Sequence, residues 1–299
     1  MAKKLGLSHC SVYYKLKEAN INPRSKNLFN ISKKELEALY LKEKLSCSKI
    51  ARIYKVNNVT VFNKLKSYGI QTRKYIEANI KYIKKEFDGN EEIKSYMIGF
   101  RLGDLNVNSL RKEATVVVKS STTKEDQVKL IKSVYGSYGH FWIKKYSEVF
   151  STMVLLDKSF NFLVKKEDNI ENWILQKDKL FFAFLAGYTD AEGNIGISQG
   201  RVRFRIRSYD KNILFQIFNK LNSLGINAKF GLALKKGIYS GVKHNKDCWG
   251  VFVYPKNDLL NLFSLIKPYM KHAKRINDLT IGENNILERN KRYQNLIII

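Results

Sequence analysis

The sequence contains few of the residues that build disulfide frameworks and zinc sites. Its three cysteines, Cys10, Cys47 and Cys248, are odd in number, widely spaced and without a CxxC pair. We therefore expect free thiols in a reducing compartment. The histidines are equally scattered, at His9, His140, His244 and His272. This scatter argues against a zinc finger and against a nuclease whose metal is held by closely spaced histidines.

Long apolar runs are also missing. The longest, Leu180 to Tyr188, is well short of the roughly 18 residues that span a bilayer. The N-terminus has no apolar signal-peptide core. We therefore expect a cytoplasmic protein that does not bind a membrane.

Acidic residues are outnumbered two to one. The chain carries 54 Lys and Arg against 27 Asp and Glu, a formal net charge of +27. Such an excess predicts a polyanionic partner, and without a membrane signal it favours nucleic acid. Hydrophobic residues make up 44% of the 299 residues, enough to build cores for two to three small domains.

The first 75 residues are the most basic, with 17 Lys and Arg against 4 Asp and Glu, and they contain a repeat. At an offset of 49 residues, Ala2–Ile21 (AKKLGLSHCSVYYKLKEANI) matches Ala51–Ile70 (ARIYKVNNVTVFNKLKSYGI), and Arg24 matches Arg73 just beyond. Each copy predicts a short helix, a turn and a second helix.

Capping residues support this reading of the repeat. Ser8 and Asn57 are the predicted N-caps of the second helices. A preceding helix from Ser32 to Leu45 opens on the capping box Ser32-x-x-Glu35. The copies resemble helix-turn-helix units, the first of them partial, with Lys64 and Lys66 as candidate DNA contacts. A pair of protein-binding helical hairpins is the alternative, which the positive charge disfavours.

Two further segments, YMIGFRLGDL (96–105) and FLAGYTDAEG (184–193), share one pattern. In each segment a small residue is followed four positions later by a second small residue, and an acidic residue comes directly after the second. These residues are Gly99, Gly103 and Asp104 in the first segment, and Gly187, Ala191 and Glu192 in the second. Small residues at i and i+4 lie on one helix face and let two backbones approach closely. If the two helices pack together, both acids lie at the same end, and paired carboxylates suit Mg²⁺.

This pattern resembles the LAGLIDADG homing endonuclease family in its single-chain form with two motif copies. The second copy keeps nine of ten positions in kind, whereas the first is degenerate. Leu105 stands where the family has a glycine that eases the turn out of the helix. The alternative is two buried amphipathic helices, each with a capping acid.

The resemblance implies an α+β fold of two tandem αββαββα halves, related by pseudo-twofold symmetry, that form a DNA-binding saddle. Periodicity in the sequence agrees with it independently. We expect a partial helix-turn-helix over 1–27, a helix-turn-helix over 28–75, a helical linker over 76–92, the first half over 93–175 and the second half over 176–299. The strands predicted for the first half are Thr115–Val118, Phe141–Ile143 and Thr152–Leu156.

Four arginines alternate with other residues in one predicted strand: Arg201, Arg203, Arg205 and Arg207. Alternation places them on one face of a sheet, where arginine reads guanine or binds phosphate. A solvated face is the alternative, disfavoured because adjacent like charges repel one another. The first half has no equal row. Its candidates for DNA contact are Lys119 and Lys144, with Ser120–Thr123 as hydrogen-bonding readers.

Phosphodiester hydrolysis needs a water nucleophile, charge neutralisation and help for the leaving oxygen, all of which metal ions supply. We predict Asp104 and Glu192 as catalytic Mg²⁺ ligands. The resemblance implies that these acids serve opposite strands across a compressed minor groove, leaving short 3′ overhangs. It implies a structural role for Asp190.

The resemblance also implies a basic residue near each active centre, late in each half. Lys274 is our preferred candidate in the second half, with Lys271 as the alternative. In the first half the candidates are Lys165 and Lys166, and we choose Lys166.

The sequence therefore predicts a monomeric, site-specific homing endonuclease that makes a Mg²⁺-dependent double-strand break in a long asymmetric DNA target, as in intron or intein mobility. One alternative is the same fold acting as a DNA-binding regulator, or as a splicing maturase with RNA as its partner. A structural protein made of basic helical hairpins is a further alternative, which the arginines and the paired acids disfavour.

Overall fold

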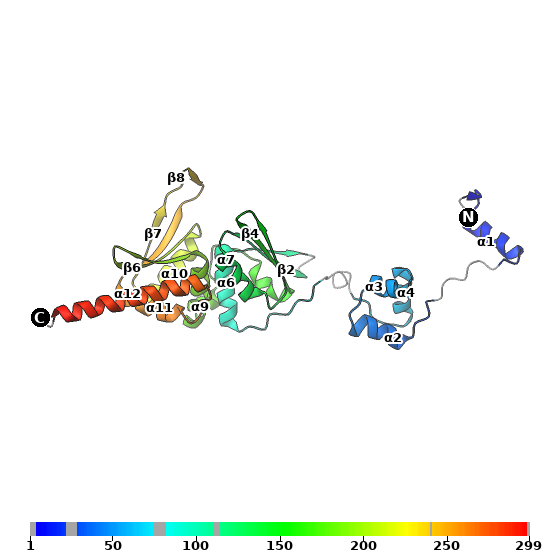
Figure 1. Ribbon diagram of the computed structural model, residues 1–299, viewed down its shortest axis with the longest axis horizontal. Helices are drawn as coiled ribbons and strands as arrows, with labels where there is room; N and C mark the ends of the chain where they lie inside the picture. The colour runs from blue at the N-terminus through cyan, green and yellow to red at the C-terminus, as the bar shows by residue number, and fades with distance from the viewer. Residues whose placement is uncertain (1–3, 22–28, 74–81, 111–113, 240, 298–299) are drawn as a thin grey trace. The chain divides into compact units, whose positions relative to one another are not determined.

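The computed structural model describes residues 4–21, 29–73, 82–110, 114–239 and 241–297 (Figure 1). The chain forms two compact units, Met1–Ile80 and Lys81–Ile299, each with a hydrophobic core of its own. Across these ranges no helix is both long and apolar enough to cross a membrane. The three cysteines are free thiols.

The first unit is helical. Its elements are α1 (His9–Glu18), α2 (Lys33–Glu37), a π-helical turn η2 (Ala38–Lys42), α3 (Cys47–Ile53) and α4 (Asn58–Ser67). The predicted caps are confirmed: the Ser8, Ser32 and Asn57 side chains each accept a hydrogen bond from a backbone N–H in the first turn of the helix that follows.

Helices α3 and α4, joined by residues 54–57, pack around a small core that includes Ile50, Val61 and Leu65. Arg73 closes this core: its guanidinium donates to the carbonyl oxygens of Lys44 and Leu45 and lies 4.3 Å from the centre of the Tyr40 ring. Arg24, the repeat counterpart of Arg73, lies outside the described residues, as do the first three residues of the chain.

The second unit begins with a half built on helix α6. The elements of this half are α6 (Glu91–Asp104), β1 (Asn106–Leu110), β2 (Thr115–Thr122), α7 (Glu125–Tyr135), β3 (His140–Tyr146), β4 (Val149–Leu156), the 3₁₀ helix η3 (Lys158–Leu163) and α8 (Asn172–Leu175). Its antiparallel sheet has the order β1-β2-β4-β3.

The next half repeats this plan from helix α9. It comprises α9 (Asp178–Glu192), β5 (Gly193–Ser198), β6 (Arg201–Ser208), α10 (Lys211–Ser223), β7 (Ala228–Leu234), β8 (Gly237–Tyr239), β9 (Val242–His244), β10 (Cys248–Val253), α11 (Lys256–Ile266) and α12 (Ala273–Ile297). Its sheet has the order β5-β6-β10-β7, the same as that of the first half with a small β8–β9 hairpin inserted. The predicted tandem α+β fold is confirmed.

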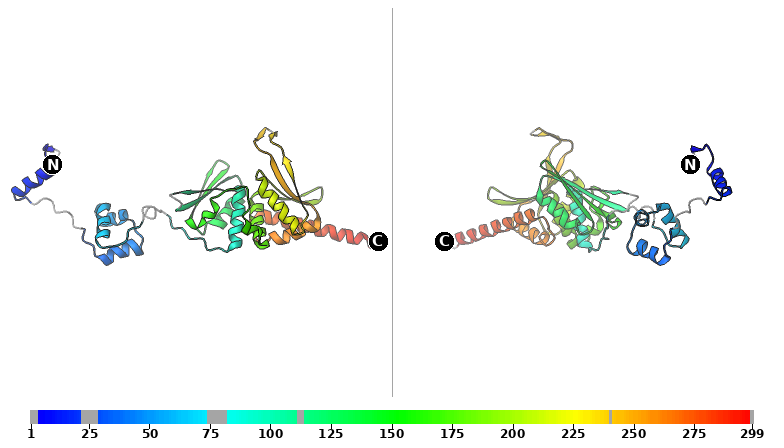
Figure 2. Two further views of the ribbon diagram at one scale, coloured as in Figure 1. Left: turned by 180° about the vertical axis from the view of Figure 1, so that it is seen from behind. Right: turned by 45° about the vertical axis from the view of Figure 1, so that its right-hand side comes forward.

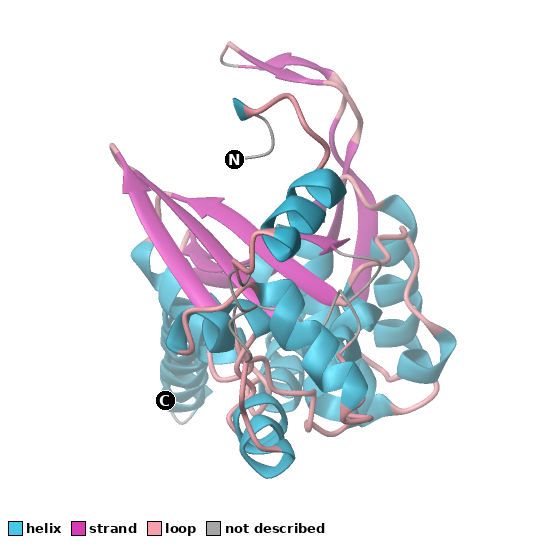
Figure 3. Ribbon diagram, turned by 90° about the vertical axis from the view of Figure 1, so that its right-hand side faces the viewer, coloured by secondary structure: helices cyan, strands magenta, loops and turns pink. Residues whose placement is uncertain are grey.

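The two sheets lie on the same side of the central helices α6 and α9, as Figures 2 and 3 show for this unit. One face of each sheet packs on helices, α7 in the first half and mainly α10 in the second. The face turned away from these helices carries polar and basic side chains, including Lys119 and the four arginines of β6. We call it the open face.

One strand of the first half was missed, and the expectation for the linker was wrong. Strand β1 was not predicted, because Asn106–Leu110 is mostly polar and becomes a strand through its pairing with β2. The linker was expected to be helical, but its described part, residues 82–90, contains no helix. It lies along the first half, where the Lys85 N–H donates to the Tyr138 carbonyl at 2.7 Å and the Phe87 N–H to Ser159 Oγ at 2.8 Å. Residues 76–81 of the predicted linker lie outside the described residues.

Candidate functional site

The site depends on how closely α6 and α9 cross. A Cβ atom added to Gly99 would lie 2.1 Å from the carbonyl oxygen of Phe184, and one added to Gly187 would lie 2.1 Å from that of Tyr96. Tyr96 and Phe184 each stand three residues before the glycine of their own helix, so the contact is symmetric. The two backbones therefore touch at a crossing that only glycine permits.

The second small residue of each motif brings the two helix ends together. A Cβ on Gly103 would lie 2.4 Å from the Cβ of Ala191 and 3.0 Å from the Cγ of Glu192. Asp104 is the last residue of α6 and Glu192 is the last residue of α9. Both carboxylates consequently lie at the same end of the helix pair.

Leu105 does not disturb this end of α6. Its backbone is extended (φ −105°, ψ 140°), as is that of Gly193 after α9 (φ −72°, ψ 154°), so neither position requires glycine for its dihedral angles. Gly193 is restricted instead by Thr189, whose Cγ2 would lie 2.5 Å from an added Cβ. The first copy has Arg101 in place of Thr189, and its guanidinium donates to the carbonyl of Leu105 at 2.5 Å.

The two acids influence each other electrostatically. Burial raises the pKa of Glu192 to about 7, with further contributions from the nearby Asp104 and Asp210 carboxylates. Asp104 keeps contact with solvent, yet partial burial of its carboxyl group raises its pKa as well. Three interactions oppose this rise in the pKa of Asp104: the positive charge of Arg275, a hydrogen bond from Gln127 and the positive charge of Lys166. The Gln127 Nε2 atom lies 2.8 Å from Asp104 Oδ2.

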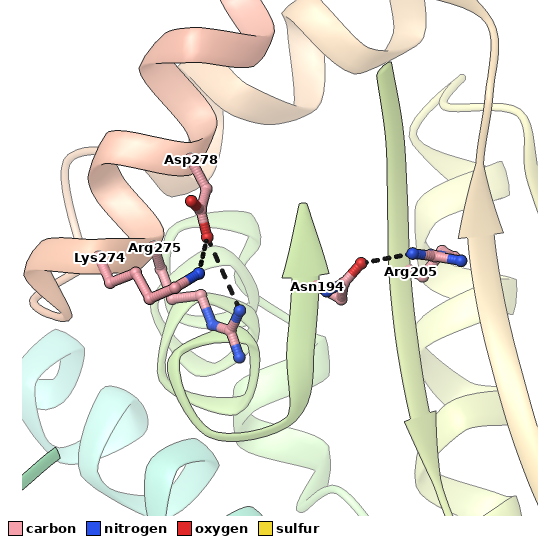
Figure 4. Close-up of polar contacts among 5 residues, drawn as sticks. All are labelled: Asn194, Arg205, Lys274, Arg275 and Asp278. Atoms are coloured by element: carbon pink, nitrogen blue, oxygen red, sulfur yellow. Dashed lines mark hydrogen bonds and ion pairs between the residues drawn. The ribbon is translucent and has the colours of Figure 1, made fainter. Parts of the chain in front are cut away.

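The cations around the acids differ in part from those expected. Lys166 lies close enough to lower the pKa of both acids, and so does Arg275. The Lys274 ammonium instead pairs with Asp278 at 2.8 Å, beside a longer 3.8 Å contact from Arg275 (Figure 4). The Lys271 ammonium lies 5.3 Å from the centre of the Tyr96 ring.

Asp104 opens onto a pocket of about 410 Å³. Hydroxyl, amide and basic groups line it together with carboxylates. The lining residues are Asp104, Ser120, Ser121, Thr122, Lys124, Asp126, Gln127, Asp190, Ala191, His272, Lys274 and Arg275. Lys274 and Ser120–Thr122 therefore lie near the acid end of the helix pair, whereas Lys271 lines a separate pocket with Asn90 and Tyr96.

Sequence reasoning missed two members of the site, Arg275 and Gln127. Arg275 directly follows Lys274 in the basic run 267–275, so a shift of one residue in register would have identified it. Gln127 had no sequence signal, because only the packing of α7 brings it to Asp104.

Asp190 has the structural role expected of it. Its Oδ2 accepts hydrogen bonds from the Tyr96 hydroxyl (2.7 Å) and from the N–H groups of Lys271 (2.8 Å) and His272 (3.1 Å). It thus joins α6, α9 and the segment that leads into α12.

The arginine row (Arg201, Arg203, Arg205 and Arg207) lies along the open face of β6, while Val202, Phe204 and Ile206 are buried on the other face. Among the described residues none of these four guanidiniums pairs with a carboxylate. The other predicted DNA contacts lie on β2, on β3 and in α4. Of these lysines, Lys119, Lys144 and Lys66 are exposed and Lys64 is half-buried.

The donor set at the helix ends fits a divalent cation. Nowhere in the described ranges do three or more His, Cys, Asp or Glu side chains gather as a metal cage. Asp104 and Glu192 offer carboxylate oxygens, and the electrostatic cost of holding both charges would fall if a cation lay between them. Hard cations that keep water ligands are held by one or two such carboxylates.

The match to a known protein family lies in the second half of the second unit. Residues 180–267 match the family model of the LAGLIDADG-like domain, which confirms the resemblance seen in the second motif copy. No curated protein sequence matches the chain.

Three solved structures are among those similar to this chain. I-DmoI in complex with DNA and Ca is 15% identical, with 64% of this chain and 97% of that chain covered and a TM-score of 0.44. I-WcaI bound to its DNA recognition sequence is 13% identical (62% and 86% covered, TM-score 0.42). Full-length DUF199/WhiA from Thermatoga maritima is 15% identical (71% and 66% covered, TM-score 0.44).

We expect Glu192→Gln to stabilise the metal-free protein at neutral and higher pH. The folded pKa of Glu192 is about 7 against an ordinary 4.5, so its ionisation costs stability as the pH rises from 4.5 to about 7. The variant should gain roughly 1–3 kcal/mol over the wild type above that range. Urea unfolding in EDTA at several pH values measures the difference, and a gain that does not change between pH 5 and pH 8 would contradict this assignment.

Proposed function

We propose that this LAGLIDADG family protein is a site-specific endonuclease that makes a divalent-metal-dependent double-strand break in DNA. The observation that carries the proposal is the convergence of Asp104 and Glu192 at one end of the glycine-lined crossing of α6 and α9. Each acid ends the helix of its own half. In this proposal the arrangement would offer one carboxylate to each strand of a duplex.

The surrounding residues have distinct roles in this proposal. Asp104 and Glu192 would hold Mg²⁺, which when bound supplies Lewis-acid stabilisation and a more acidic water. Gln127 fixes the orientation of the Asp104 carboxylate. Lys166 and Arg275 supply positive charge beside both acids, where it would offset the charge that develops on the phosphate in the transition state. Lys274 lines the same pocket and would contact the DNA backbone.

The open faces of the two sheets would bind the duplex. The sheets lie on one side of the helix pair (Figure 1), and no carboxylate of the described residues forms an ion pair with the arginine row. The helix-turn-helix unit would add a second DNA contact. Its segment from Lys44 to Arg73 contains seven Lys and Arg and no acid.

A supercoiled plasmid library with a randomised insert tests the proposal. We expect linear products cut at one sequence in Mg²⁺ and none in EDTA. Enrichment of a bound sequence without cleavage would favour a DNA-binding regulator, and preferential retention of RNA would favour a maturase. No sequence-specific binding to DNA would overturn the proposal.

We expect removal of residues 1–75 to weaken DNA binding and to flatten its salt dependence, because those residues carry a net charge of +13. Each lost phosphate contact lowers the slope of log K against log salt by about 0.9. The remaining chain keeps the whole second unit, so it should cut the same central site at higher protein concentration. Filter binding at several salt concentrations measures the slope, and a change in the preferred central bases would show that the first unit reads them instead.

A further inference from the structure

We propose that the two sheets read half-sites of different length and base composition. The sheet of the second half reads a long, guanine-containing half-site through the arginine row. The sheet of the first half reads only the central base pairs, with a preference for A·T. The inference rests on the proposed DNA binding of the saddle and goes beyond it, because it assigns the chemistry of each half-site.

The pseudo-twofold symmetry allows the two open faces to be compared residue by residue. Asn106 stands two residues after Asp104 and pairs in register with Lys119, whereas Asn194 stands two residues after Glu192 and pairs with Arg205. Lys119 is therefore the counterpart of Arg205. Extending the registers along β2 and β6 gives the counterparts of Arg201, Arg203 and Arg207, which are Thr115, Val117 and Ser121.

The comparison shows one cation on β2 where β6 has four. At the inner end, nearest the acids, Ser121 and Lys119 are exposed on β2. At the outer end Val117 is fully buried and Thr115 is 7% exposed, whereas their counterparts Arg203 and Arg201 are half-buried and exposed. The outer end of β2 therefore offers no side chain to a duplex.

The linker explains why the outer end of the first sheet is covered. The Lys84 ammonium donates to Thr115 Oγ1 at 2.8 Å and to the Ala114 carbonyl at 2.5 Å. The Tyr82 ring stacks on His140 with a 3.9 Å separation of the ring centres, and His140 pairs in register with Leu155 on β4, the neighbour of Val117. The linker thus occupies surface that its symmetric counterpart leaves to the arginine row.

The side chains themselves indicate which bases each face reads. Arg205 Nη2 donates to Asn194 Oδ1 at 2.7 Å (Figure 4), so the guanidinium is already oriented on the open face. Arginine pairs bidentately with guanine. The first sheet presents the row Asn106, Lys119, Met153 and Trp142. In this row Lys119 is the one side chain suited to guanine, whereas the asparagine amide suits adenine and the apolar groups suit the thymine methyl.

The test is a binding selection from randomised DNA in Ca²⁺, which recovers bound sequences whether or not they are cut. We expect specified bases to extend further from the centre on one side, with guanine enriched there. Arg203→Lys keeps the charge and removes the bidentate fork. It should lose about 5- to 150-fold in preference at one outer position on the long side, and affinity for the selected site should fall by about the same factor. Arg289→Lys, on α12 and outside the arginine row, is the matched control and should change no position.

Four outcomes separate this inference from the proposed function. Specified blocks of equal length and equal guanine content on both sides would overturn the inference alone, as would an unchanged preference in Arg203→Lys. An asymmetric selected site that is never cut in Mg²⁺ would support the inference and overturn the nuclease. Recovery of no specific sequence would overturn both.

Discussion

Replacing Asp104 with Asn, or Glu192 with Gln, is expected to lower double-strand cleavage by about 10³-fold or more while DNA binding stays nearly unchanged. Each substitution removes a carboxylate from the paired ends of α6 and α9. A loss of this size corresponds to about 4 kcal/mol of transition-state stabilisation, within the range of metal-assisted catalysis. Single-turnover cleavage of the selected target measures the rate, and gel-shift titration measures the binding.

The matched control is Glu288→Gln. Glu288 is exposed on α12, so the variant makes the same chemical change and the same charge change away from the helix ends. It should cut at the wild-type rate. Full cleavage by either acid variant would show that Asp104 and Glu192 are not the metal ligands of the reaction.

Replacing Gly187 with Ala should destabilise the second unit by about 3 kcal/mol or more, and Gly187→Leu should prevent stable folding. The added Cβ would lie 2.1 Å from the Tyr96 carbonyl oxygen and 2.9 Å from the Phe100 nitrogen. Both atoms belong to the backbone of α6, so relief requires the helices to separate. Thermal and urea unfolding of the chain measure the change.

Gly231→Ala in β7 is the control for the glycine change. A Cβ there meets no heavy atom within 4 Å, so the variant should lose less than about 1 kcal/mol. If Gly187→Ala were as stable as Gly231→Ala, the close crossing of α6 and α9 would be wrong.

The sequence predicted those parts of the molecule that local chemistry determines. Ser8, Ser32 and Asn57 are N-caps because a short polar side chain before a helix satisfies a free N–H group. The arginine row follows from strict alternation along a strand. The position of Asp104 and Glu192 at the same end of the helix pair was predicted from the small residues spaced four apart in each motif.

Features set by tertiary packing could not be predicted. Strand β1 exists through its pairing with β2, and hydrogen bonds from the N–H groups of Lys85 and Phe87 hold the described part of the linker against the first half. Gln127 reaches Asp104 only through the packing of α7. The Lys274 ammonium is directed to Asp278 by its position one helical turn away, and such side-chain geometry cannot be read from a basic run.

The central claim is that Asp104 and Glu192 together form a divalent-metal centre. Its most direct test is electron paramagnetic resonance of Mn²⁺ added to the complex of the protein with its selected DNA, compared with that DNA alone. We predict that the wild-type complex binds Mn²⁺ beyond what the DNA binds, and that Asp104→Asn and Glu192→Gln each lose this binding while Glu288→Gln keeps it. Unchanged Mn²⁺ binding in either acid variant would contradict the account.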